Sequence, residues 1–143
     1  LIREIKEAFS SEYIGRGGKA YVERFELTPY AAIKIITEAG GIPVMAHPGY
    51  LSDRTSIFEE TIQKYIACGL QGIEVYYSCH TLSQINYYLD IARKYDLLIT
   101  GGSDSHGNKE PILGSVRLPY KYVRALKRAK RANSATINVP LNR

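Results

Sequence analysis

The chain has 143 residues, which is long enough to enclose one hydrophobic core. A hydrophobic share of 45% and a charged share of 23% are typical of a globular protein, and no apolar run is long enough to cross a membrane. Its two cysteines lack CxxC spacing and are too few for a disulfide framework, so we expect a reducing, cytoplasmic location.

The start of the chain is unusual, because it begins at Leu1 and reads at once as a helix without a capping residue. We expect a piece of a longer protein, although an omitted disordered start or tag would give the same beginning. Residues 1–30 contain a glycine-rich turn at 15–18 and do not share the alternation of strands and helices that the rest of the sequence predicts. We interpret them as a separate small element, an insertion packed over the main domain of residues 31–143.

Three short apolar runs predict strands that are buried on both faces, as in a parallel sheet. They lie at residues 42–46, 72–77 and 97–100. All three are preceded or followed by a helical pattern, and this alternation predicts right-handed crossovers in an α/β fold. The spacing fits either a (β/α) barrel or a doubly wound sheet.

Helices are predicted from their start and stop signals. The first spans about 28–40, with Thr28 as its capping residue, and the second spans about 55–69. A third begins at Thr81, where Gln84 completes a capping box.

Six basic residues fall between Lys121 and Arg131. Their spacing favours the solvated face of an amphipathic helix. A run of this kind can also contact nucleic-acid phosphates, and both interpretations remain open. The inward positions of the helix would be Tyr122, Ala125, Leu126 and Ala129.

All three histidines follow a predicted strand, where ligands bind in α/β folds. In an extended Asp104-x-His106 segment both side chains point the same way, so that a carboxylate and an imidazole converge on one cation. Such mixed donors suit Zn, Mn or Fe. The alternative is a loop in which Asp104 caps a turn and His106 faces solvent. His47 precedes Pro48, which we expect to hold it in an extended conformation.

The sequence gives weaker indications of a functional role for the other polar residues in or near the second predicted strand. His80 begins a capped helix and could be a surface residue. Glu74 lies within the second strand, where it could support a ligand histidine. Cys79 is expected to be inert. Residues 15–19 form the one stretch that resembles a phosphate loop.

Two segments resemble late motifs of the PHP (polymerase and histidinol phosphatase) superfamily. They are residues 40–49 (GGIPVMAHPG) and 98–107 (LITGGSDSHG), and the closer similarity is to nucleotide phosphoesterases and ribonuclease AM-like 5′–3′ exonucleases. The resemblance covers residues 13–119, including YIGRGGKAYV, GIEVYY and the LG…LP segment. Ser105 departs from it, since a bulky aromatic is common there.

The resemblance implies the C-terminal portion of a distorted (β/α)7 barrel with part of a small helical insertion. It implies a cluster of up to three divalent ions, Mn, Zn or Fe. His47, Asp104 and His106 would be metal ligands, and Asp104 and His106 would be catalytic. Arg16 and Lys19 would bind the substrate phosphate. His80, which follows the second predicted strand, is a weaker substrate-binding candidate by its position alone.

The early motifs of the family, which supply its other ligands, are absent from this sequence. We therefore expect the chain alone to be weak or inactive, with the N-terminal half of the barrel as its missing partner. The complete protein would hydrolyse phosphate esters of nucleotides or short RNA. A degenerate non-catalytic module, a nucleic-acid-binding module and an amidohydrolase are the alternatives. Self-association is also expected, because an incomplete barrel exposes strand edges.

Overall fold

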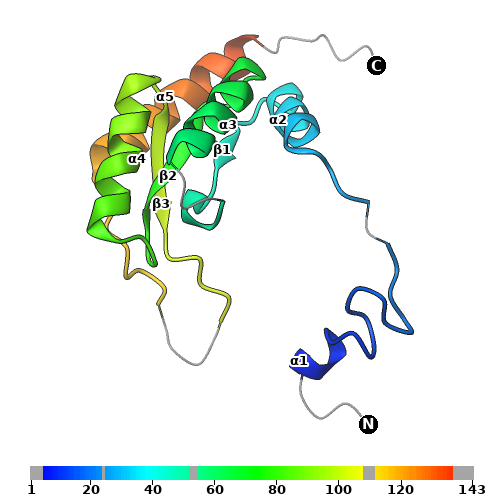
Figure 1. The fold of residues 1–143 in the computed structure, drawn as a ribbon. Helices are drawn as coiled ribbons and strands as arrows, with labels where there is room; N and C mark the ends of the chain where they lie inside the picture. Colours follow the sequence, from blue (N-terminus) through cyan, green and yellow to red (C-terminus); the bar gives the residue numbers. More distant parts are fainter. Residues whose placement is uncertain (1–4, 24, 52–54, 108–111, 137–143) are drawn as a thin grey trace.

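The computed structural model describes residues 5–23, 25–51, 55–107 and 112–136. It has a parallel sheet with helices packed around it and a separate N-terminal segment (Figure 1). The elements are α1 (Ile5–Ala8), α2 (Pro29–Glu38), β1 (Val44–Met45), a 3-10 turn (Pro48–Tyr50), α3 (Thr55–Ala67), β2 (Gly72–Tyr77), α4 (Leu82–Lys94), β3 (Leu98–Gly102) and α5 (Tyr120–Thr136).

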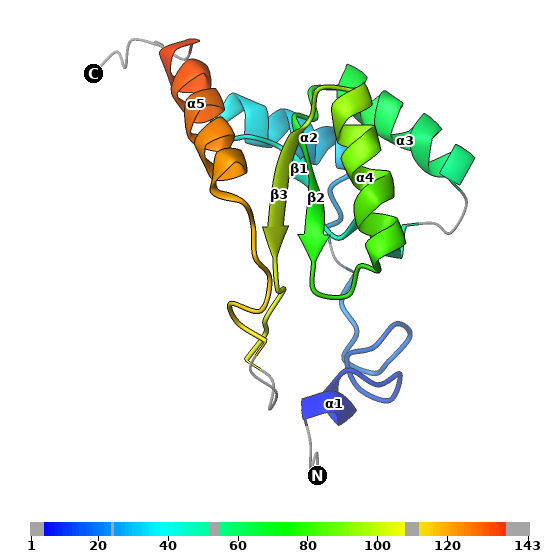
Figure 2. The ribbon, with the colours of Figure 1, turned by 90° about the vertical axis from the view of Figure 1, so that its left-hand side faces the viewer.

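The sheet has the order β1-β2-β3, and both pairings are parallel. The strands therefore end at the same edge, as the arrowheads of β2 and β3 show in Figure 2. The predicted strand at 42–46 shortens to two residues in β1, whereas β3 continues beyond 100 through Gly102. Gly101 permits this extension, since a Cβ there would lie 2.6 Å from the Cβ and carbonyl oxygen of Tyr76.

The capping signals read from the sequence are confirmed. The Thr28 side chain accepts the Ala31 N–H at the start of α2. At the start of α4, Thr81 and Gln84 form both hydrogen bonds of a capping box. These caps satisfy backbone donors that the first turn of a helix leaves free.

One face of β2 carries the core. Ile73 and Val75 are fully enclosed and belong to a single buried cluster. The opposite face presents Glu74 and Tyr76, which are half-buried. The helices contribute Ile33 from α2, Phe58 and Ile62 from α3, and Tyr88, Ile91 and Ala92 from α4 to the same cluster.

Helix α5 is the predicted amphipathic helix. Its inward positions Tyr122, Ala125, Leu126 and Ala129 are half-buried, and its six basic residues are exposed. The Tyr122 ring lies 6.0 Å from that of Tyr76. None of the described helices is long and apolar enough to span a bilayer.

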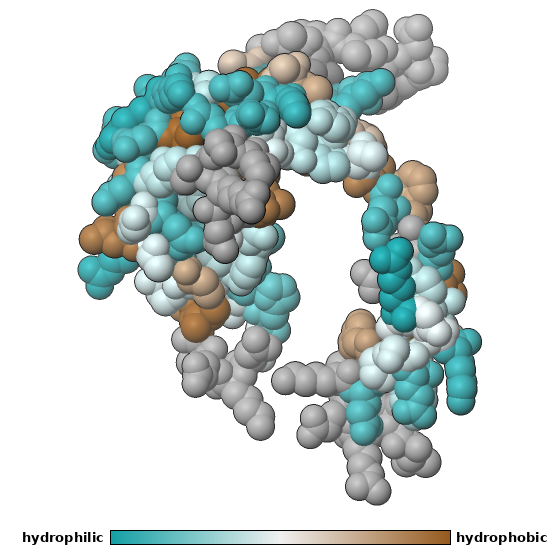
Figure 3. Space-filling model, viewed as in Figure 1, coloured by the Kyte–Doolittle hydropathy of each residue, from teal (hydrophilic) through white to brown (hydrophobic). Residues whose placement is uncertain are grey.

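The N-terminal segment folds locally. The Ala20 N–H donates to the Tyr13 carbonyl, which closes a loop after α1. Figures 1 and 3 show this segment as an arm that is joined to the α/β body through α2 and does not cover it. Its assignment as an insertion element stays a prediction.

Candidate active site at the strand ends

The three loops with histidines meet where the parallel strands end. His47 follows β1, His80 follows β2, and residues 103–106 follow β3. The Ser78 hydroxyl donates to the Ser103 carbonyl at 2.9 Å and ties the second loop to the third. The sheet thus brings segments that are far apart in sequence to one edge.

A carboxylate from β2 fixes the backbone of His47. Glu74 Oε2 accepts the His47 N–H at 2.6 Å, the short distance of a charge-assisted hydrogen bond. His47 has φ 31° and ψ 58°. The expectation of an extended His47 before Pro48 was therefore wrong: the preference for extended backbone before a proline is overridden here, and the bond to Glu74 accompanies a left-handed turn. Glu74 supports this histidine through its backbone, not through its ring.

Tyr77, at the end of β2, connects His47 with Asp104. Its hydroxyl lies 3.3 Å from Asp104 Oδ2 and 3.1 Å from the Tyr50 hydroxyl. The His47 ring lies 5.4 Å from the Tyr50 ring and 5.8 Å from the Tyr77 ring. Sequence reasoning did not identify either tyrosine as a site residue, although GIEVYY placed Tyr77 at a strand end.

The Tyr77 hydroxyl takes part in two hydrogen bonds, one with Asp104 and one with Tyr50. Its pKa is raised well above the ordinary value, first by the hydrogen bond to Tyr50 and then by burial. The Tyr77 hydroxyl therefore stays protonated at neutral pH and can donate to Asp104 Oδ2, whereas in its contact with the Tyr50 hydroxyl either oxygen can be the donor.

Asp104 and His106 come together through a turn. Asp104 has φ 55°, so the extended backbone expected for this pair was wrong. The two side chains are nevertheless close, with His106 Nδ1 lying 3.9 Å from Asp104 Oδ1. His106 Nδ1 is also 2.8 Å from the Asp104 carbonyl oxygen. A carbonyl can only accept, so Nδ1 is the donor in this contact, and in the neutral form of the ring Nε2 then has the lone pair that can bind a metal.

His80 is partly buried in the loop that follows β2. Its Nδ1 lies 2.9 Å from the Val75 carbonyl oxygen, and its ring lies between those of Tyr77 and Tyr88. Its Nε2 is buried and has no hydrogen-bond partner within the described part of the chain. The arrangement favours a packing role, and a substrate-binding role for His80 stays a prediction.

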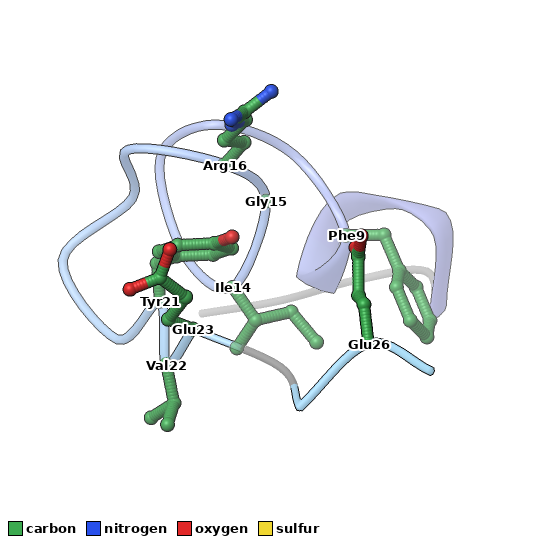
Figure 4. A pocket seen from close by; sticks show the side chains of 8 residues that line it. All are labelled: Phe9, Ile14, Gly15, Arg16, Tyr21, Val22, Glu23 and Glu26. Atoms are coloured by element: carbon green, nitrogen blue, oxygen red, sulfur yellow. The ribbon is translucent and has the colours of Figure 1, made fainter. Parts of the chain in front are cut away.

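The two basic residues expected to bind the substrate lie in the N-terminal segment. Arg16 lines a cavity of about 560 Å³ there with Phe9 and Tyr21, among others. Figure 4 shows its guanidinium directed away from the other lining side chains. Lys19 is exposed. The structure does not bring either residue to the strand ends (Figure 1).

The donor set fits a divalent cation only in part. Asp104 and His106 offer an oxygen and a nitrogen on one loop. Tyr77 lies between this loop and His47, because its hydroxyl contacts Asp104 and its ring lies near the His47 ring. Among the described residues, however, no three His, Cys, Asp or Glu side chains gather closely enough to hold an ion. A complete metal site would need further ligands.

The fold and these strand ends define the class: the chain forms part of an α/β barrel with polar side chains at the carboxyl ends of its strands. Two solved structures show the same fold. An amidohydrolase from Chromobacterium violaceum, solved with sulfate and without metal, has a TM-score of 0.64 and 28% identity, over 90% of this chain and 46% of that protein. A protein from Bifidobacterium adolescentis described as a metal-dependent phosphoesterase has a TM-score of 0.65 and 32% identity, over 87% and 44%.

Two curated relatives of this chain are phosphoesterases by name. A phosphoribosyl 1,2-cyclic phosphate 1,2-diphosphodiesterase from Eggerthella lenta is 38% identical over 76 residues, 53% of this chain and 27% of the relative. A 3′,5′-nucleoside bisphosphate phosphatase from Chromobacterium violaceum is 30% identical over 109 residues, 76% and 38%. No family model matches the sequence.

The resemblance to phosphoesterases of the PHP type is confirmed for the part of the fold that is present. The chain spans between 27% and 38% of the length of the two curated relatives.

Proposed function

We propose that the complete protein containing this chain is a metal-dependent phosphoesterase that hydrolyses phosphate esters of nucleotides or short oligonucleotides. The carrying observation is the Tyr77 hydroxyl, which links the loop after β1 with Asp104 after β3. The relatives support the choice of chemistry, since two are phosphoesterases of nucleotide-related phosphates by name.

In this proposal His47, Asp104 and His106 are metal ligands, and the remaining ligands come from outside the residues of this chain. Divalent ions at such a site would supply an activated water and neutralise charge on the phosphoryl oxygens. Tyr77 keeps the Asp104 carboxylate oriented by donating to Oδ2. Glu74 keeps His47 in its left-handed turn. The two roles together hold potential ligands in place before any substrate arrives.

The finer parts of the proposal concern the metal ions, the substrate and the direction in which RNA is degraded. We propose Mn, Zn or Fe as the ions and a 5′–3′ exonuclease-like attack on short RNA, with Arg16 and Lys19 approaching the substrate phosphate. This last role requires the N-terminal arm to come closer to the strand ends than in the structure (Figure 1). The 143-residue chain by itself is expected to have little activity, because it lacks the remaining metal ligands.

Replacement of Asp104 tests the proposal. The complete protein, loaded with Mn or Zn, would be assayed for phosphate release from nucleoside bisphosphates and for shortening of 5′-phosphorylated RNA. We expect Asp104→Ala to lower turnover by at least about ten- to a hundredfold, because this is the loss that follows when even a residue that only supports a metal ligand is removed. Asp90→Ala is the matched control, since Asp90 is exposed on α4 and forms an ion pair with Arg93 on the same helix.

Unchanged turnover in Asp104→Ala would reject the site. Failure of the unaltered protein to release phosphate from any ester would favour a non-catalytic module, and cleavage of C–N bonds instead would favour an amidohydrolase.

A further inference from the structure

The exposed side of α5 is not accounted for by the proposed hydrolysis. From residue 111 to the end, the sequence has eight basic residues and no Asp or Glu, whereas residues 1–110 have eleven basic and fourteen acidic residues. The net charge of +5 therefore divides into +8 on the last segment and −3 on the rest. Such an asymmetry produces a positive field around α5.

The arginines of α5 share one side of the helix. Tyr120, Arg124, Arg128 and Arg131 follow one another at intervals of three or four residues, which places them along a single exposed stripe. We call these four residues the α5 arginine face. The three arginines make no ion pair with an acidic side chain among the described residues. Their guanidinium groups are thus available to an external anion.

The opposite side of α5 is fixed to the body. The Asn133 side-chain amide donates to the Gly41 carbonyl oxygen and to Gln71 Oε1, both at 3.2 Å. Lys130 donates to the Gly40 carbonyl oxygen at 2.5 Å, and the Tyr122 ring packs on Tyr76. Since the apolar side is engaged, the helix cannot bury it in a lipid layer, as a membrane-surface helix must. Its external partner must be recognised by charge.

The dimensions of the face suit a nucleic-acid strand. Arg124 and Arg131 are seven positions apart, so they lie roughly 10 Å apart along the axis, about the rise of three nucleotides in a strand whose bases are stacked as in a duplex. Tyr120 is 64% exposed, and its ring lies within 5.8 Å of the Lys127 ammonium. An exposed aromatic ring beside cations is the combination that binds single strands, because a base stacks on the ring while the phosphates meet the arginines.

A further basic residue, Arg117, lies beside the candidate active site. Arg117 lines a cavity of about 310 Å³ with Tyr77 and Ser78, which belong to the end of β2 and its loop. Helix α5 starts at Tyr120, close after Arg117 in sequence, and runs away from the strand ends (Figure 2). A strand that enters this cavity can continue along the helix.

We infer that the α5 arginine face is a docking surface for the phosphate backbone of single-stranded nucleic acid. The binding needs neither metal nor hydrolysis, so it goes beyond the proposed function and can be tested apart from it.

Binding of a labelled, unstructured RNA of about 12 nucleotides would be followed by fluorescence anisotropy, in EDTA and over a range of salt concentrations. With three phosphate contacts, the logarithm of the affinity should fall with the logarithm of salt with a slope of about −2. Arg124→Gln/Arg128→Gln/Arg131→Gln should remove most of this slope and weaken binding about ten- to a hundredfold near 0.1 M salt. Tyr120→Ala should weaken binding about tenfold.

The control Lys34→Gln/Lys64→Gln/Arg93→Gln loses the same charge from other exposed positions and should bind as the unaltered protein does. Circular dichroism should show the same helix content in all variants. Equal loss in both triple variants, a salt-independent affinity, or tighter binding to duplex than to the single strand would overturn the inference. So would binding to phosphatidylserine vesicles that the arginine variant loses to the same extent.

Discussion

A partly buried hydrogen bond between Glu74 and the backbone of His47 fixes the most constrained residue of the site. A residue other than glycine in the left-handed region costs about 1–3 kcal/mol and persists where its surroundings hold it. His47 has φ 31°, and its N–H lies 2.6 Å from Glu74 Oε2. The carboxylate thus offsets the local strain and at the same time determines where the imidazole points.

We predict that Glu74→Ala destabilises the protein by about 1–3 kcal/mol, because the His47 N–H loses a charged, partly buried acceptor. The loss would be measured by urea denaturation, and the His47 ring resonances should shift in an NMR spectrum. Glu60→Ala, which removes an exposed carboxylate of α3, should change neither quantity. If the two variants behave alike, Glu74 does not position His47.

Sequence reasoning reached His47, Asp104 and His106 but not the way in which they are held. The left-handed turns at His47 and Asp104 depend on contacts between loops, and local propensity does not contain such contacts. Tyr50 and Tyr77 were missed for the same reason. Their hydroxyls lie 3.1 Å apart, yet 27 residues separate them in the chain.

At the scale of elements, helix caps and short apolar runs were reliable because their signals are local. Thr28 and Thr81 were identified from two or three neighbouring residues and cap as expected. The extent of the strands was less predictable. β1 is shorter than its apolar run, and β3 continues through two glycines whose pairing with β2 depends on a register shift between Glu74 and Tyr76.

The capping box of α4 should make a measurable contribution to stability. We expect Thr81→Ala to lower the free energy of unfolding by about 1 kcal/mol, since a backbone donor loses its acceptor. Thr81→Ser, which retains the hydroxyl, should be close to the unaltered protein. Equal loss in both variants in thermal and urea unfolding would argue against the cap.

At the scale of the molecule, the exposed surface of the body includes an apolar cavity of about 250 Å³ between α2 and β1. Ile36 lines it and is 40% exposed, and β1 pairs with only one neighbouring strand among the described residues. An open strand edge beside an apolar surface favours association with another chain. Composition alone did not place this surface, because it forms only when α2 packs beside the sheet.

We predict that the 143-residue chain self-associates in a concentration-dependent way through this surface. Ile36→Lys should increase the monomer fraction in sedimentation velocity, because a charge at the cavity wall opposes its burial. Ile35→Lys is the matched control, since Ile35 is 49% exposed on the same helix but does not line the cavity. A monomer at every concentration, or equal effects of both lysines, would contradict the prediction.

The bond from Glu74 to His47 also links the order of β1 to the position of His47. It joins the loop after β1, an edge strand of two residues, to the central strand β2. Edge elements with few backbone bonds open at low free energy, well before global unfolding. Whenever β1 leaves the sheet, His47 loses its support and the site loses one of its candidate ligands. The fraction of molecules that hold His47 in place is therefore coupled to the fraying of one short strand.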